Sequence, residues 1–319
     1  MAEIALAFGA LLGVVVIVGA IIGVLRARAP YAQDDLVALG RSQRAAFVQT
    51  TYSVLVTLVV FGAAVVTHMV FPLWQGVSFL VGPALGTAAG LTVFALFPAV
   101  PIEGDVDRYV ASFERRNSRA LASRTLRWTF VGSTVLAIAV IVACGSISRA
   151  APDGRFVCTA LFDVSCTVGG PYLFPGWYFG VPAIIAVVLL AASIVIALRR
   201  VTVSPGAAWP ELVEADRVLR ENAARLILCI GIAPLMLTTG MVLAAAGLPL
   251  FNAPVLVTGL TGGAAHALLV LGLVVMLAGA VAMLVGLAFT VAAARSGISV
   301  GRLSRRGREG AARAAERTA

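Results

Sequence analysis

The sequence contains no lysine and very little charge of either sign. Only 12% of its 319 residues are charged, whereas 60% are hydrophobic and the mean hydropathy is +1.00. Soluble globular domains carry about 25% charged residues, so this composition excludes an ordinary soluble domain and predicts an integral membrane protein. Because arginine is used in place of lysine throughout, a bias typical of GC-rich bacterial coding, we expect a multi-pass protein of a bacterial cytoplasmic membrane.

Ionisable groups are missing from the middle of every long apolar run, although the chain has 15 acidic residues. Proton- and ion-coupled carriers usually place such a group at membrane depth, so this kind of transport is disfavoured. The chain also lacks the H-E-x-x-H, G-x-S-x-G and Walker motifs. No catalytic residue can be named, and we favour a protein that is not an enzyme.

Seven apolar runs reach the length of about 20 residues that crosses a bilayer core. The first run follows Glu3 and precedes Arg26 and Arg28, the reverse of the charge order in a signal peptide, so we expect it to remain as a membrane helix. The sequence therefore predicts an all-α bundle of seven transmembrane helices over 1–293, followed by a basic tail at 294–319. The predicted helices lie near 4–25, 51–71, 78–98, 129–148, 177–198, 225–246 and 267–292.

The arginines predict the orientation of the bundle. Only Arg149 and Arg155 lie in the loop at 149–176. The others lie in or beside 26–50, 99–128, 199–224 and the tail after 293. Cytoplasmic segments of membrane proteins are rich in arginine, so we expect an exoplasmic N-terminus and a cytoplasmic C-terminus. The net charge of +9 is then a property of loops, and it does not indicate nucleic-acid binding.

Short amphipathic helices are expected on the cytoplasmic side. In the segment at 103–127, apolar residues recur at helical spacing and six arginines accompany them. Such a helix either lies on anionic lipid headgroups or is a solvated connector. Three R-x-x-R pairs precede outward-going helices, which suggests a threefold hairpin repeat or chance. The predicted basic surface comprises Arg41, Arg44, Arg108, Arg115, Arg116, Arg119, Arg217 and Arg220.

Small residues predict how the helices pack, because close backbone approach drives helix association in lipid. Stripes of glycine occur in the first, third and seventh runs; their members are Gly9, Gly13, Gly82, Gly86, Gly90, Gly272, Gly279 and Gly286. These stripes predict internal contacts, with a homo-oligomer face on the first helix as the alternative. Pro83, Pro182 and Pro234 predict helix kinks.

The exoplasmic loops contain the remaining candidate sites. Cys158 and Cys166 are expected to form a disulfide in the loop at 149–176. His68 and His266 fall at the outer ends of their predicted helices, and two imidazoles at one level are able to bind haem or a metal ion. Two ligands alone make a sparse site, so no cofactor is predicted.

Three functions remain from the sequence. The favoured one is a scaffold or accessory subunit that binds a protein partner or anionic lipid. The second is a passive transporter of a small molecule or lipid through a cavity between the proline-kinked helices. The third is a haem or metal site at the outer membrane face.

Overall fold

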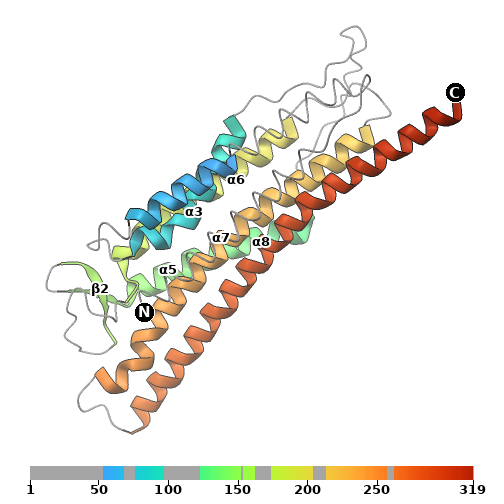
Figure 1. The fold of residues 1–319 in the computed structure, drawn as a ribbon. Coiled ribbons are helices and arrows are strands. Elements are labelled where there is room, and N and C mark those ends of the chain that lie inside the picture. Colours follow the sequence, from blue (N-terminus) through green and yellow to red (C-terminus); the bar gives the residue numbers. More distant parts are fainter. Residues whose placement is uncertain are drawn as a thin grey trace.

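A computed structural model gives the fold of the protein (Figure 1). The residues that it describes are 53–67, 76–96, 123–151, 154–161, 174–203, 213–256 and 262–318.

Long helices dominate these residues. They are α3 (Val77–Leu96), α5 (Arg124–Ser146), α6 (Trp177–Val203), α7 (Val213–Leu256) and α8 (Gly263–Thr318). Each of the five contains a segment long and apolar enough to cross a membrane, and the helix Ser53–Thr67 is apolar but shorter. The protein is therefore a helical membrane protein with several membrane-length helices. The first predicted helix, at 4–25, lies outside the described residues.

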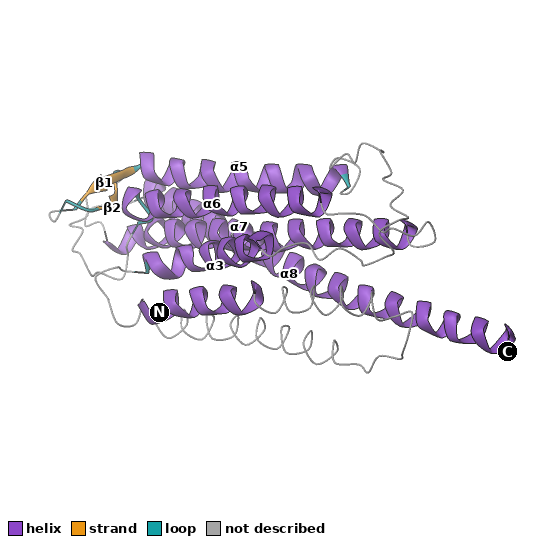
Figure 2. Ribbon diagram, turned by 90° about the horizontal axis from the view of Figure 1, so that it is seen from above, coloured by secondary structure: helices purple, strands orange, loops and turns teal. Residues whose placement is uncertain are grey.

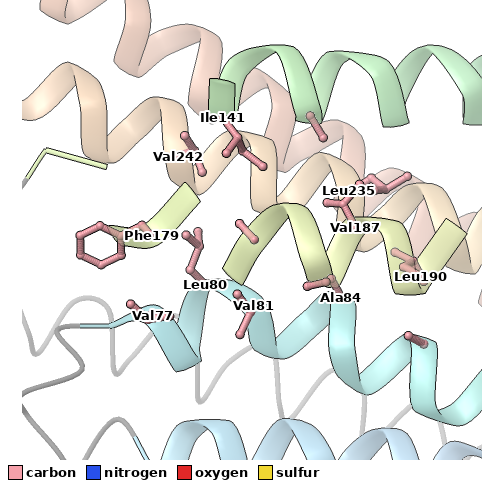
Figure 3. Packing of buried hydrophobic residues seen from close by; sticks show 14 of the residues in the cluster. Val77, Leu80, Val81, Ala84, Ile141, Phe179, Val187, Leu190, Leu235 and Val242 are labelled. Atoms are coloured by element: carbon pink, nitrogen blue, oxygen red, sulfur yellow. The ribbon is translucent and has the colours of Figure 1, made fainter. Parts of the chain in front are cut away.

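Helix α7 forms the centre of the bundle. In its apolar segment Arg220–Ala253, 72% of the membrane-length window is buried by protein, against 17% for that of α8. Figure 3 shows the core around it, where Leu235 of α7 lies near Val187 and Leu190 of α6, with Ala84 of α3 beside them. All four side chains are fully buried, so α3, α6 and α7 enclose a packed apolar interior.

Two helices are longer than the sequence predicts. Helix α7 continues to Leu256 and α8 begins at Gly263, so most of the connection between the helices predicted at 225–246 and 267–292 is helical. The helix continues through Pro249, and α8 packs directly beside this part of it: a Cβ on Gly272 would lie 2.8 Å from the carbonyl oxygen of Gly247. At the N-terminal end of α7, the polar segment that begins at Val213 and the apolar segment Arg220–Ala253 form one continuous helix, as Figures 1 and 2 show.

Helix α5 also begins earlier than predicted, at Arg124 instead of 129. Ser123 is its N-cap, and the Ser123 hydroxyl accepts a hydrogen bond from the backbone N–H of Leu126 at 3.2 Å. A serine at this position satisfies one of the amide groups that the first helical turn leaves free. The last part of the expected amphipathic helix at 103–127 is therefore the first turn of α5.

A small β-hairpin connects α5 to the loop before α6, where the sequence predicts no strand. Strand β1 (Ser148–Ala150) pairs antiparallel with β2 (Phe156–Thr159), with Arg149 opposite Cys158. Gly154, in the connection, has a φ of 82°, which a glycine adopts without strain. The sequence carries this signal as Pro152, Asp153 and Gly154, a typical turn tripeptide.

Candidate interaction surfaces

The glycine stripe of α3 faces the helix Ser53–Thr67. A Cβ on Gly82 would lie 3.0 Å from the Ala64 Cβ, and one on Gly86 would lie 2.9 Å from the carbonyl oxygen of Thr57. A Cβ on Gly90 would lie 2.6 Å from the carbonyl oxygen of Ser53. Side chains at these positions would push the two helices apart, so the stripe is an internal packing surface.

A second glycine contact joins α7 to α8. Gly279 of α8 lies against Gly240 of α7, and a Cβ on Gly240 would come within 2.6 Å of the Gly279 carbonyl oxygen. Gly272 meets Gly247 in the same way, and a Cβ on Gly286 would lie 2.9 Å from the carbonyl oxygen of Ala233. The α8 glycines stand out in the sequence by their regular spacing. Their partners on α7 do not, because Gly240 and Gly247 lie among many other small residues.

The remaining predicted packing residues, Gly9 and Gly13, lie outside the described residues. So do six members of the predicted basic surface, namely Arg41, Arg44, Arg108, Arg115, Arg116 and Arg119.

Arginines gather at one end of the described helices. Helices α5, α6 and α7 meet at one level, where Gly231 lies against Phe130 and Ile194. Arg127 comes before Phe130 in α5, Arg225 comes before Gly231 in α7, and Arg200 comes after Ile194 in α6. Because α6 runs in the opposite direction to α5 and α7, all three arginines lie on the same side of this level. Among the described residues, arginines therefore outnumber acidic residues at this end of the bundle.

Two arginines at this end, Arg200 and Arg220, cap helix C-termini. Arg200 of α6 donates a hydrogen bond to the carbonyl oxygen of Phe94, in the last turn of α3, and its guanidinium group lies 5.2 Å from the centroid of the Phe94 ring. Arg220 of α7 donates to the carbonyl oxygen of Val201 at 3.1 Å, near the end of α6. Carbonyl groups at a helix C-terminus lack partners within the helix and carry partial negative charge, so each arginine stabilises the end of its neighbour.

The placement of Arg220 corrects the predicted basic surface. Arg220 is only 9% exposed, and its side chain extends to α6, where it contacts Val201. Arg217, the other member of the same R-x-x-R pair, is 66% exposed and forms an ion pair with Glu221 at 3.1 Å. One turn of α7 therefore places Arg217 on the surface and Arg220 inside the bundle.

The two histidines do not form a described site. His266 lies in the first turn of α8, exposed, with its Nδ1 3.0 Å from the carbonyl oxygen of Gly262. His68 lies outside the described residues. Within the part of the chain that the structure describes, no group of three His, Cys, Asp or Glu residues is placed to hold a metal ion.

Hydroxyl groups within the helices bond mostly to their own backbone. Thr87 donates to the carbonyl oxygen of Pro83 at 2.8 Å, and Thr239 donates to that of Leu235 at 2.7 Å. One pair links two helices: Thr92 Oγ1 of α3 lies 2.9 Å from Ser193 Oγ of α6. Pro83, Pro182 and Pro234 lie inside α3, α6 and α7 respectively. These hydroxyls and prolines belong to packed helices, and the α3–α6 contact is closed.

The opposite end of the bundle is covered by aromatic residues. Phe174 and Phe179 are buried, and the backbone N–H of Phe174 donates to the carbonyl oxygen of Val157 in β2 at 2.9 Å. The Arg155 guanidinium lies 5.3 Å from the ring centroid of Tyr178. Cys158 is buried in β2, whereas Cys166 lies outside the described residues, so their disulfide stays a prediction.

An open groove of about 330 Å³ lies at the start of α5, and the residues described in its lining are Arg124, Arg127, Trp128 and Val131. Arg124 and Trp128 are exposed, and Arg127 is partly buried. The sequence predicts that these arginines belong to a separate surface helix, so it does not predict the groove.

No protein family, no curated protein and no solved structure matches this chain.

Proposed function

We propose that this protein is a scaffold or accessory subunit of the bacterial cytoplasmic membrane, without catalytic activity of its own, and that it binds a protein partner and anionic lipid. The proposal includes seven transmembrane helices, an exoplasmic N-terminus and a cytoplasmic C-terminus. The arginine-rich end of α5, α6 and α7 supports this orientation, because basic residues favour the cytoplasmic side.

The observation that carries the proposal is the length of the α7–α8 pair. Helix α8 has 56 residues and is therefore about 84 Å long, whereas a bilayer core is about 30 Å thick. Its apolar part is Gly263–Ala294, and the helix continues through the basic tail. The helix leaves the bundle and extends well beyond it (Figure 2). A helix held to its neighbour by glycine contacts and continuing out of the membrane is suited to bind another component.

The packed interior weighs against the alternative of passive transport. That function needs a cavity between α3, α6 and α7, where the prolines lie. Leu190 and Leu235 are fully buried there, and Thr92 contacts Ser193 between α3 and α6. A scaffold needs no such cavity, so the filled core fits it better.

Native mass spectrometry of the protein released gently from its own host membranes tests the proposal. We expect a complex with a stoichiometric protein partner. A variant that ends at Ala294 keeps the apolar α7–α8 pair but lacks the basic helix, and it should lose that partner. A matched variant, Arg302→Gln/Arg305→Gln/Arg306→Gln, keeps the helix length and separates the effect of charge from that of length.

Recovery of the full-length protein without any protein partner would contradict the scaffold. If a small molecule is retained instead, transport or cofactor binding becomes the better explanation. A Soret band in the absorption spectrum, lost on His266→Ala substitution, would establish the haem alternative.

The proposal also includes a disulfide between Cys158 and Cys166. Cys144 and Cys229 are free and buried, so in the denatured, unreduced protein a maleimide should modify two of the four cysteines. Reduction should expose all four, and Cys166→Ser should leave Cys158 reactive without reduction. Labelling of all four cysteines before reduction would disprove the disulfide.

A further inference from the structure

We infer that the groove at the start of α5 binds the phosphate group of an anionic phospholipid, whose acyl chain lies along the exposed face of the helix. The proposed function includes two kinds of partner, a protein and an anionic lipid. This inference rests on the second of these, and it names the lipid class and the site that binds it.

The chemistry along one helix face follows the order of groups in a phospholipid. Arg124, Arg127, Trp128 and Val131 are separated by three, four and seven residues from the first, a spacing that places them on one face. Arginine stands at the positive end of the bundle, tryptophan comes next, and Val131 and Val135 follow, 45% and 60% exposed. Phosphate, ester and acyl groups follow each other in the same order in a bilayer, and tryptophan prefers the level of the ester groups.

The two arginines of the groove have no partner among the residues that the structure describes. Four other described arginines are engaged: Arg200 and Arg220 with backbone carbonyls, Arg217 with Glu221, and Arg155 with Tyr178. By contrast, no hydrogen bond or ion pair joins the guanidinium group of Arg124 or Arg127 to any residue that the structure describes.

Arg127 gives the stronger argument for anion binding. Its Nε atom is buried and has no hydrogen-bond partner among the described residues, an arrangement that is rare and costly in proteins. A nearby anion offsets the cost of a partly buried positive charge. Guanidinium groups bind phosphate through paired hydrogen bonds, and the amino end of α5 adds partial positive charge at the same place.

The apolar part of the groove favours a lipid over a free anion. Trp128 is 64% exposed and lies beside the arginines. Inorganic phosphate has no apolar group that could pack against its indole ring. A phospholipid buries the indole ring and the valines below it while its phosphate meets the two guanidinium groups.

Lipid retention by the purified full-length protein tests the inference. Native mass spectra are recorded in detergent with phosphatidylglycerol or with phosphatidylcholine of the same acyl chains. We expect the protein to retain phosphatidylglycerol preferentially. The variant Arg124→Gln/Arg127→Gln should retain about tenfold less of it, as expected when charge-assisted hydrogen bonds are lost.

The matched control is Arg199→Gln/Arg225→Gln, which removes two exposed arginines from the same end of the bundle. It should change retention by less than about twofold, the size expected for charge outside a specific site. Equal loss in both double variants would overturn the inference in favour of general charge attraction, and equal retention of both lipids would overturn it outright. If the double variant does not fold, Arg124→Gln alone, at an exposed position, serves in its place.

Inorganic phosphate distinguishes the two sources of the anion. Phosphate in about hundredfold excess should leave the lipid bound, since it lacks the apolar contacts; displacement would overturn the assignment to a lipid. Loss of lipid binding in these experiments leaves the search for a protein partner untouched, so failure of this inference is distinguishable from failure of the scaffold.

Discussion

Arg217 and Arg220 stand three residues apart in the chain, yet they lie in opposite environments. Arg220 is buried and bonds to the end of α6, whereas Arg217 points to the surface and meets Glu221. A shared motif therefore does not give the two residues a shared role. The energetic consequences of losing each should differ accordingly.

We predict that Arg220→Met destabilises the protein far more than Arg217→Met. The first change removes the buried hydrogen bond from Arg220 to the Val201 carbonyl oxygen, at a cost of about 1–3 kcal/mol. The second removes an exposed i,i+4 ion pair, worth about 0.3–0.5 kcal/mol. Unfolding in mixed micelles by SDS, followed by circular dichroism, measures both. Equal losses would show that the Arg220–Val201 bond does not stabilise the bundle.

Side-chain partners of this kind could not be predicted from the sequence. Arg200 bonds to Phe94, 106 residues earlier, and only the packing of α6 against α3 brings them together. The sequence shows where positive charge accumulates, because that depends on composition alone. It does not show which arginine faces lipid, water or a neighbouring helix, because that depends on the rotation of each helix about its axis.

At the scale of helices, glycine contacts decide how α7 and α8 meet. We predict that Gly240→Ala weakens this pair, whereas Gly132→Ala does not. Both changes gain about 1 kcal/mol of helix propensity, but only at Gly240 does the new Cβ meet backbone atoms; at Gly132 nothing lies within 4 Å. Overpacking of this kind costs about 1–3 kcal/mol.

The difference between the two alanine variants isolates the packing term. It is measured as the shift in the midpoint of SDS-induced unfolding, with Gly240→Ala expected below Gly132→Ala. If the two midpoints coincide, the α7–α8 interface tolerates the methyl group and the close contact is not a stabilising one.

Helix packing was more predictable than helix boundaries. Glycine at regular spacing in α3 and α8 shows on its own which face permits close approach. The ends of α7 were not predictable in the same way, because Pro249 and Pro254 normally interrupt a helix, whereas α7 continues past both, beside α8. The β-hairpin was missed for a different reason: its strands have three and four residues, too few to show a period of two.

For the whole molecule, the number of membrane crossings and the side of each terminus are linked. An odd number of crossings places the two ends of the chain on opposite sides, and an even number places them on the same side. The five membrane-length helices and the shorter helix Ser53–Thr67 together make an even number of candidate crossings. Whether the total is odd or even therefore depends on the segment at 4–25, which lies outside the described residues.

We predict opposite sides for the two termini. In a background without native cysteines, Ser304→Cys in the tail should react with a membrane-impermeant maleimide only after lysis, because arginine-rich segments stay in the cytoplasm. Ala160→Cys, at an exposed position after β2, should react in intact cells, and so should a cysteine added before Met1. Protection of the N-terminal cysteine with Ala160→Cys still reactive would reduce the count to an even number. Protection of Ala160→Cys together with reaction of Ser304→Cys in intact cells would invert the whole bundle and move the groove of α5 to the outer leaflet.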